Sequence, residues 1–363
     1  MLLLVLDGMK EGFLIPIVVY AYITLLHLIL PARWVDGYVT DESGKPMRYR
    51  LNGLPVLFIV LGTWYALGHF DILPLGYIAL YWVPSLIGAF ILGMIFSWWV
   101  VQKEPPVTDS YGKDFFLGRA ENPQWFGGRI DAKMWLYLVG AVMLALNVAS
   151  ALAQRYVEVG QLETGYILYT AMFGWFIVDY LFFERIHLWT YDFFAERVGF
   201  KLGWGCLTFY PYFYGFASWF LIYQNPLRQS TWEYFLYAAI FLSGWCLARG
   251  ANMQKWTFKV APEKAFLGFL KPEVVTDGER KLLVSGWWGA SRHINYLGEI
   301  LMATGIALTL GWWNWVCWLY PLYYVLLLFP RQHDDDKRCA KKYGRLWEEY
   351  TAKVRWRIIP GIY

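Results

Sequence analysis

Charged residues are scarce in this chain of 363 residues. Asp, Glu, Lys and Arg together make up 17% of it, against about 25% in ordinary soluble domains, whereas apolar residues reach 58%. This composition excludes a soluble globular protein, and it excludes disordered and collagen-like chains as well. Aromatic residues alone make up 20%. Lipid-facing helices do not need so many rings, so we expect many of them to line the interior of a membrane protein.

Cysteine is also sparse, and the common nucleotide-binding motifs are missing. The four cysteines form no C-x-x-C pair and have no histidine at ligand spacing, so we expect neither a disulfide framework nor a zinc site. No G-x-G-x-x-G or P-loop sequence occurs, which excludes a Rossmann or Walker-type site. We expect no metal and no nucleic acid as partner; protein partners stay undetermined.

Long apolar runs recur along the whole chain. A transmembrane helix needs about 20 mostly apolar residues to cross roughly 30 Å of hydrocarbon. The runs predict an all-α fold, a polytopic integral membrane helix bundle of about nine to ten transmembrane helices. We expect one domain over 1–363, with N-terminal helices in 1–183 and C-terminal helices in 202–363. The runs are 12–30, 53–70, 75–101, 134–153, 165–183, 202–223, 232–247, 296–310 and 312–329.

Basic residues are distributed unevenly around these runs. Lys and Arg are retained on the cytoplasmic side, and short loops carry this bias. If the runs cross alternately, five segments share one side and hold every basic residue except Lys10, Arg155 and Arg228. We therefore predict a cytoplasmic C-terminus, in a bacterial inner membrane or in the endoplasmic reticulum. The five segments are 31–52, 102–133, 184–201, 248–295 and 330–363.

The C-terminal tail predicts an amphipathic helix from Asp334 to Ala352, with three acids in its first turn, where the helix dipole favours them. One stripe of this helix mixes an acid, a thiol, a cation and phenols, unlike an ordinary core face. Two interpretations are open at this point: a helix lying on lipid headgroups, or one wall of a polar pocket. The stripe consists of Asp335, Cys339, Lys342, Tyr343, Leu346 and Tyr350.

A second polar stripe stands at the start of the run 296–310. Burying such groups costs several kcal/mol unless they are paired or line a wet cavity, so they indicate function. A buried pair of Arg292 with Glu299 is the structural alternative, but it leaves Asn295 and Tyr296 unexplained. The stripe occupies positions i, i+3, i+4 and i+7 of one helical face: Arg292, Asn295, Tyr296 and Glu299.

A third element lies just after the run 232–247. Lys255 and Lys259 stand one helical turn apart, and their alternative interpretation is ordinary positive-inside flanking. Together with Lys341 and Lys342 they form a cluster suited to a polyanion. Nearby rings are able to stack on a flat heterocycle, so the combination suits a nucleotide cofactor.

The motifs around these stripes resemble the sterol reductases that reduce the Δ14 or Δ7 double bond, a family that includes the membrane domain of the lamin B receptor. The resemblance rests on the run LLVSGWWGASRHINYLGE at 282–299 and on the ending C-x-x-K-Y-G-x-x-W-E-x-Y at 339–350. Asp114-Phe-Phe-x-Gly118 with Asn122-Pro123, and the block 249–255, match further family signatures. The resemblance covers almost the whole chain.

This resemblance implies a membrane enzyme that uses NADPH, held by the C-terminal half together with the sterol substrate. Its contact positions coincide largely with the stripes above, which favours the cofactor wall over the interfacial helix. The predicted cofactor contacts are Lys255, Lys259, Leu283, Trp288, Arg292, Asn295, Tyr296, Arg331, Asp335, Cys339, Ala340, Lys341, Lys342, Tyr343 and Tyr350.

The family chemistry is an ionic reduction, in which an acid protonates the alkene before hydride arrives. Asp179 and Glu184 are the candidate proton donors, since a buried carboxyl has a raised pKa and stays protonated at neutral pH. The alternative for Glu184 is pairing with Arg185 or His187. Gly-Trp-Trp-Gly at 286–289 favours the Δ14 double bond, whereas the Pro-Gly-Ile-Tyr ending leans toward Δ7. A Δ7 reductase and a non-catalytic sterol-binding scaffold are therefore the alternative functions.

Overall fold

The computed structural model describes residues 2–224 and 229–363, and the chain divides into two units, Met1–Pro226 and Leu227–Tyr363. Most of the described residues are helical, as predicted. The all-α expectation needs one correction, because three two-stranded antiparallel sheets are also present. Arg228, one of the three basic residues set apart by the charge argument, lies outside the described residues.

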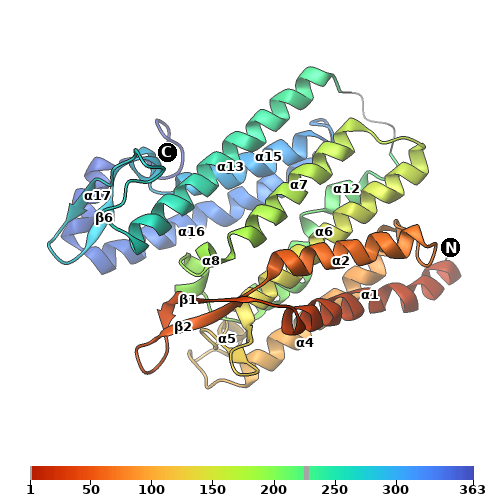
Figure 1. The fold of residues 1–363 in the computed structure, drawn as a ribbon, viewed down its shortest axis with the longest axis horizontal. Helices are drawn as coiled ribbons and strands as arrows, with labels where there is room; N and C mark the ends of the chain where they lie inside the picture. The colour runs from red at the N-terminus through yellow and green to blue at the C-terminus, as the bar shows by residue number, and fades with distance from the viewer. Residues whose placement is uncertain (1, 225–228) are drawn as a thin grey trace. The chain divides into compact units, whose positions relative to one another are not determined.

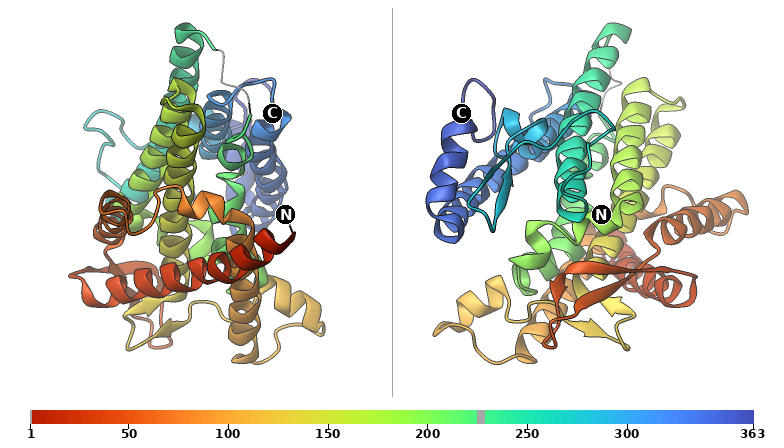
Figure 2. Two further views of the ribbon diagram at one scale, coloured as in Figure 1. Left: turned by 90° about the vertical axis from the view of Figure 1, so that its right-hand side faces the viewer. Right: turned by 60° about the vertical axis from the view of Figure 1, so that its left-hand side comes forward.

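The first unit is built around one buried helix, α6 (Ala132–Val159). Of its most apolar stretch 78% is buried, because helices and loops cover it on all sides. The carboxylate of Asp131 caps its first turn by accepting from the N–H groups of Lys133 and Met134, and Gly160 ends it in a left-handed conformation. Figure 2 shows α7 (Thr164–Phe182) beside it.

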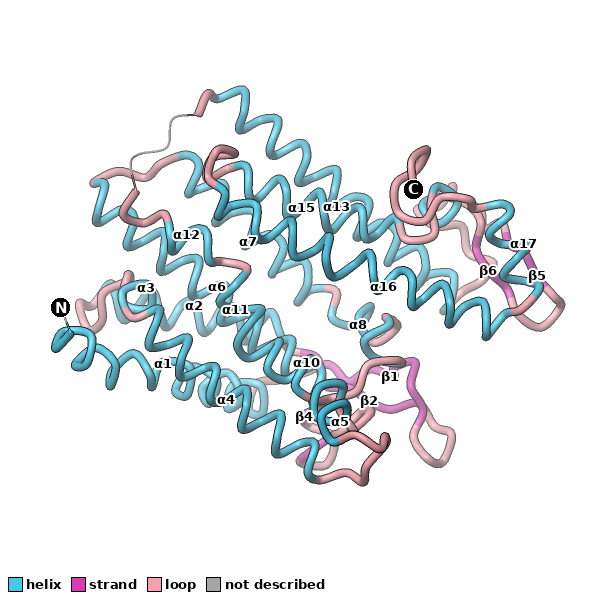
Figure 3. The backbone as a smooth tube through the Cα atoms, turned by 180° about the vertical axis from the view of Figure 1, so that it is seen from behind, coloured by secondary structure: helices cyan, strands magenta, loops and turns pink. Residues whose placement is uncertain are grey.

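The N-terminal part of this unit pairs α1 (Leu2–Ile29) with α4 (Trp82–Gln102). One hairpin, β1 (Arg33–Thr40) with β2 (Pro46–Leu51), follows α1. A second, β3 (Gln124–Trp125) with β4 (Ile130–Asp131), comes after α4; both are magenta in Figure 3. The remaining helices of this part are α2 (Gly53–His69), α3 (Tyr77–Leu80) and α5 (Tyr111–Leu117).

The predicted crossing at 202–223 is not a continuous helix. A π-helical turn, η1 (Gly205–Phe209), and a break before α12 (Phe216–Phe220) divide it into short pieces. Pro211 and the glycines of this stretch explain the breaks, since proline removes a backbone donor and glycine weakens a helix. The other short helices of this part are α8 (Glu184–His187), α9 (Tyr191–Phe194), α10 (Phe200–Trp204) and α11 (Tyr210–Phe213).

In the second unit α13 (Thr231–Val260), α15 (Ile294–Leu308) and α16 (Leu319–Tyr343) run side by side (Figure 1). α13 begins with a complete capping box, in which Ser230 and Glu233 satisfy each other's backbone N–H groups. The smaller elements are β5 (Val274–Thr276), β6 (Lys281–Leu283), α14 (Trp287–Ala290), η2 (Trp315–Trp318) and α17 (Arg345–Lys353).

Five helical stretches among the described residues are long and apolar enough to cross a membrane, fewer than the nine runs of the sequence. Two more runs form the shorter apolar helices α2 and α15, a third is the interrupted stretch 202–223, and the last is η2 with the start of α16. The five stretches are Glu11–Ile29, Trp82–Gln102, Ala132–Val159, Thr164–Phe182 and Thr231–Val260.

The prediction of one tail helix from Asp334 to Ala352 is wrong, because the helix begins earlier and is interrupted before Ala352. α16 begins at Leu319 and passes through the three aspartates without a break, so these acids are not in a first turn. The helix ends at Gly344, whose φ of 54° lies in a region that glycine tolerates and other residues avoid. α17 then starts in a new direction, which separates Leu346 and Tyr350 from the α16 part of the stripe.

Candidate active site

The α13–α15 contact positions the first wall of the candidate site. A Cβ atom added at Gly298 of α15 would lie 2.4 Å from the backbone nitrogen of Ala248, and one at Gly244 of α13 would lie 2.6 Å from the carbonyl oxygen of Gly298. Only small residues allow two helix backbones to approach so closely. This approach brings the C-terminal turns of α13 next to the start of α15, where Asn295 donates to Asn252 at 3.4 Å.

Trp288 is fixed against the end of α13. Its indole Nε1 donates to the carbonyl oxygen of Ala251 at 2.8 Å, and the Nζ atom of Lys255 lies 5.0 Å from the ring centroid. The turn that carries Trp288 is held by Gln254, which donates to the Ser285 carbonyl and accepts from the Trp287 N–H. The sequence reasoning assigned no role to Asn252 or Gln254. Their place in the block 249–255, which matches a family signature, was the signal that could have found them.

Three lysines form a cluster of positive charge beside this ring. The charges of Lys255 and Lys342 both act on Lys259, so α13 and α16 bring these cations into mutual reach. Within residues 2–224 and 229–363 none of the three forms an ion pair with a carboxylate. Like charges held together without an ion-paired carboxylate favour binding of a polyanion.

α16 contributes the opposite wall with Asp335, Cys339 and Tyr343. Burial and the charge of Asp335 raise the pKa of the Cys339 thiol to about 12, with Lys255 and Lys342 acting in the other direction. The thiol therefore stays neutral and acts as a contact rather than as a nucleophile. Tyr343 is flanked by the cations of Arg280 and Lys342, 5.7 and 5.2 Å from its ring centroid.

Arg292 is committed to other partners. Its side chain is 7% exposed, and its guanidinium donates to the carbonyl oxygens of Val354 and Arg355 and to the carboxylate of Asp336 at 3.3 Å. The ion pair considered from the sequence was with Glu299; the pair in the structure is with Asp336. Burial opposes ionisation of Asp336, but contact with His293 and the charge of Arg292 hold its pKa below the usual value.

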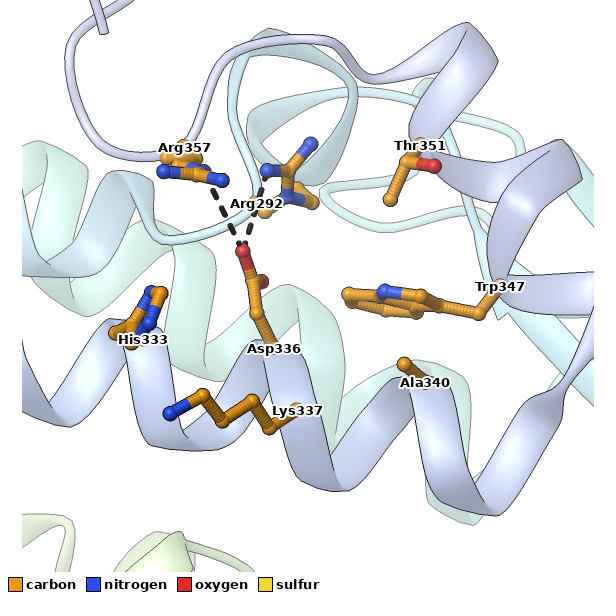
Figure 4. Close-up of a pocket in the computed structure, with 8 residues that line it drawn as sticks. All are labelled: Arg292, His333, Asp336, Lys337, Ala340, Trp347, Thr351 and Arg357. Atoms are coloured by element: carbon orange, nitrogen blue, oxygen red, sulfur yellow. Dashed lines mark hydrogen bonds and ion pairs between the residues drawn. The ribbon is translucent and has the colours of Figure 1, made fainter.

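The remaining predicted cofactor residues differ in their surroundings. Tyr350 packs with Val275, Leu346 and Val354 in a hydrophobic cluster, which Tyr343 also contacts. Leu283 is buried at the end of β6, Tyr296 stacks on His293, and Lys341 is exposed on α16. Arg331 lies half-buried one turn before Asp335, and Ala340 borders the pocket drawn in Figure 4. All fifteen belong to the unit Leu227–Tyr363.

The two candidate proton donors belong to the other unit. Glu184 is 8% exposed, and within the described residues its carboxylate has one hydrogen bond, from the N–H of Gly53 at 3.1 Å. The alternative interpretation paired Glu184 with Arg185 or His187, whereas its hydrogen bond comes from Gly53. Burial raises the pKa of Glu184 to about 7, and the Gly53 hydrogen bond offsets this only in part. Asp179 lies one turn earlier, near the end of α7.

The carboxylate of Asp114 in the early signature fixes a loop. Asp114 is buried, and it accepts from the N–H groups of Val107 and Thr108, the Thr108 hydroxyl and Arg119. Although burial opposes ionisation, these bonds lower its pKa to about 2. We assign this motif a structural task, namely fixing the loop before α5.

The fold and the site define a class of protein: a multi-pass helical membrane protein whose C-terminal unit carries a cluster of lysines flanked by aromatic rings. The chain belongs to the Ergosterol biosynthesis ERG4/ERG24 family, which matches residues 2–363. This confirms the family that the sequence motifs indicated.

Several curated relatives resemble the chain over most of its length. A Delta(14)-sterol reductase of Arabidopsis thaliana is 33% identical over 355 residues, which is 95% of this chain and 94% of that protein. The Delta(14)-sterol reductase of Methylotuvimicrobium alcaliphilum is 29% identical over 93% of this chain and 80% of its own length. Delta(14)-sterol reductase TM7SF2 of Mus musculus is 32% identical over 92% and 82%.

Proposed function

We propose that this protein reduces the Δ14 double bond of a sterol biosynthesis intermediate with NADPH. The observation that carries the proposal is the cluster of Lys255, Lys259 and Lys342 beside Trp288, because it combines an unmatched positive charge with a flat ring. The names of the relatives, all Delta(14)-sterol reductases, support the choice of double bond.

The residues of the second unit fit a dinucleotide. The lysines would hold its phosphates, and Trp288 and Tyr343 offer ring faces for its bases. The Oδ1 atom of Asn295 is buried without a hydrogen-bond partner, so it is available as an acceptor for an amide or hydroxyl. When bound, NADPH supplies the hydride of the reduction.

We propose that a carboxyl group of this chain protonates the substrate. A sterol alkene without an electron-withdrawing substituent is too poor an electrophile for direct hydride attack, so an acid must first convert it to a tertiary cation. Glu184 suits this task since its raised pKa keeps a proton on the carboxyl near neutral pH. Asp179, one turn earlier on α7, is the second candidate. Aromatic side chains around an apolar substrate would stabilise the developing cation.

We further infer a nine-crossing arrangement with a cytoplasmic C-terminal unit. The five long helices, the two shorter apolar helices, the interrupted stretch 202–223 and the start of α16 together supply the crossings. Interrupted helices are tolerated at membrane depth where protein surrounds them. The endoplasmic reticulum, or the inner membrane of a bacterium, would house such a protein.

Mass spectrometry of sterols incubated with the purified protein and NADPH tests this function. We expect Δ8,14 dienes to gain two hydrogens and Δ5,7 dienes to remain unchanged. Reduction of the Δ5,7 diene instead would identify a Δ7 reductase. If neither diene is reduced and NADPH fluorescence does not respond to the protein, a non-catalytic sterol-binding scaffold is the remaining function.

The donor assignment has its own test. Asp179→Asn and Glu184→Gln keep the size of each side chain and remove its acidity, and both are assayed on the accepted diene. Full activity in both variants would remove these residues as proton donors while leaving the rest of the proposal intact.

A further inference from the structure

A pocket of about 370 Å³ lies on a different face of α16 from the cofactor stripe. At about 100° per residue, Lys337 and Ala340 point away from the side that carries Asp335, Cys339 and Lys342. Figure 4 shows Asp336 turned toward two arginines, with Trp347 reaching in from α17. The pocket is therefore separate from the lysine cluster described above, although Arg292 and Ala340 of the predicted cofactor contacts line it.

Positive charge exceeds negative charge in this pocket. Arg292, Lys337 and Arg357 are permanent cations, and the carboxylate that faces them is Asp336. This carboxylate is already shared, because it accepts from Gln332 at 2.7 Å and pairs with Arg292 at 3.3 Å and with Arg357 at 3.5 Å. One carboxylate cannot neutralise three cations, so an excess of positive charge remains.

Two of these cations also have unused hydrogen-bond donors. The Nε atom of Arg292 is buried and has no acceptor, although the rest of the guanidinium is bonded. In the part of the chain that the structure describes, the ammonium group of Lys337 makes neither a hydrogen bond nor an ion pair. A free ammonium group can donate to an anionic ligand, and the charge of the buried guanidinium adds to the attraction.

We propose that this pocket binds a phosphate group and that it does so independently of the nicotinamide cofactor. Guanidinium groups match the geometry of phosphate oxygens, and the excess positive charge suits a dianion better than a carboxylate. The flat face of Trp347 offers a surface for the group that carries the phosphate, whereas the hydroxyl of Thr351 already donates to the carbonyl oxygen of Glu348.

The phosphate could come from a soluble compound or from a lipid headgroup. His333, at the edge of the pocket, stands one helical turn beyond Phe329, where the apolar run 312–329 ends. One turn is about 5.4 Å, so the pocket lies at headgroup depth if that run crosses the bilayer. The experiment therefore needs one arm for each source.

Both arms use purified protein in lipid-free detergent with saturating NADP⁺, which keeps the cofactor site filled. In the first, equilibrium dialysis measures binding of radiolabelled inorganic phosphate. In the second, native mass spectrometry compares phosphatidic acid with diacylglycerol, which has the same chains without the phosphate. Lys337→Gln is the informative variant, since Lys337 has no hydrogen bond or ion pair to any described residue whose loss would disturb folding. Lys353→Gln, on the exposed surface of α17, is the charge-matched control.

We expect phosphate or phosphatidic acid to bind, and Lys337→Gln, but not Lys353→Gln, to weaken that binding by roughly tenfold. Binding in the dialysis arm indicates a soluble ligand, and binding of phosphatidic acid alone indicates a headgroup. The proposal is overturned if neither binds while NADP⁺ is saturating, or if Lys337→Gln behaves like the control. None of these results depends on sterol reduction, so the proposed function is judged separately.

Discussion

Glu184 illustrates how one buried residue acquires its chemistry from distant neighbours. The residue follows α7 directly, yet its one hydrogen-bond partner among the described residues is the backbone of Gly53 at the start of α2. Because the carboxyl group is removed from water without a cation to stabilise its charge, the protonated form is favoured up to a pH of about 7. A proton donor needs this state.

The raised pKa of Glu184 predicts how activity depends on pH. If the protonated carboxyl is the donor, kcat/KM for the sterol should be constant below pH 7 and fall about tenfold per unit above it. Glu184→Gln should lower activity by at least a hundredfold and remove this limb. Glu121 forms an exposed ion pair with Arg197, so Glu121→Gln should retain the wild-type dependence of activity on pH. A wild-type rate that does not change between pH 6 and 8.5 would exclude Glu184.

Lys255 allows a second prediction at the residue scale. Lys255→Gln should raise the Kd for NADPH by roughly tenfold with a smaller effect on kcat, because a phosphate-binding charge contributes to binding of both ground and transition states. NADPH fluorescence titration measures the Kd. Lys264→Gln removes an equal charge from an exposed loop and should bind NADPH as the wild type does. Equal affinities in the two variants would contradict the assignment of Lys255.

Arg292 shows where a single-residue prediction from the sequence goes beyond its evidence. Its spacing from Asn295 and Tyr296 predicted one helical stripe, but α15 begins at Ile294 and Arg292 lies in the turn before it, so that prediction is wrong for Arg292. Spacing also does not say what lies opposite a side chain. In the structure the segment 354–357 lies opposite, and it takes most of the hydrogen-bonding capacity of Arg292. A residue more than sixty positions away in the chain leaves no mark on the local pattern.

At the scale of elements, the pair α13 and α15 depends on small residues at its crossing. Gly298→Ala would place a methyl group 2.4 Å from the backbone nitrogen of Ala248, so the helices must separate. We expect a loss of about 2 kcal/mol of stability, as for other overpacked contacts. The thermal unfolding midpoint in detergent measures this loss.

Gly62→Ala is the matched control for this prediction. Gly62 is also a helix-interior glycine, on α2, but no atom lies within 4 Å of an added methyl group. Alanine has the higher helix propensity, so this variant should be neutral or slightly stabilising. If Gly298→Ala unfolds at the same temperature as Gly62→Ala, the close approach of the two helices is not what stabilises this unit.

The helix boundaries show which element-level features were predictable. All nine apolar runs coincide with helical segments, since hydrophobic composition over 15 to 20 residues is a strong local signal. The interruption of 202–223 and the continuation of α16 to Tyr343 were not predicted. Both depend on packing, which decides between a helix that breaks and a helix that extends where local propensities are balanced.

At the scale of the whole molecule, the distribution of basic residues makes a prediction about topology. A side-sensitive reporter inserted at Gly44, in the β1–β2 turn, or after Tyr363 should report the cytoplasm. The same reporter inserted at Gln161, between α6 and α7, should report the opposite side. A cytoplasmic signal at Gln161 would contradict the proposed arrangement of crossings.

The sequence by itself determined the membrane class, the family and the C-terminal third as the basic, polar part of the chain. These properties follow from composition and from motifs of contiguous residues, so no tertiary contact is needed to read them. Only the tertiary structure decided that Glu184 is buried without a cation, that Arg292 holds the segment 354–357, and that a second basic pocket lies on another face of α16. Burial and charge balance depend on residues that meet in space after being far apart in the chain, and local periodicity carries no information about them.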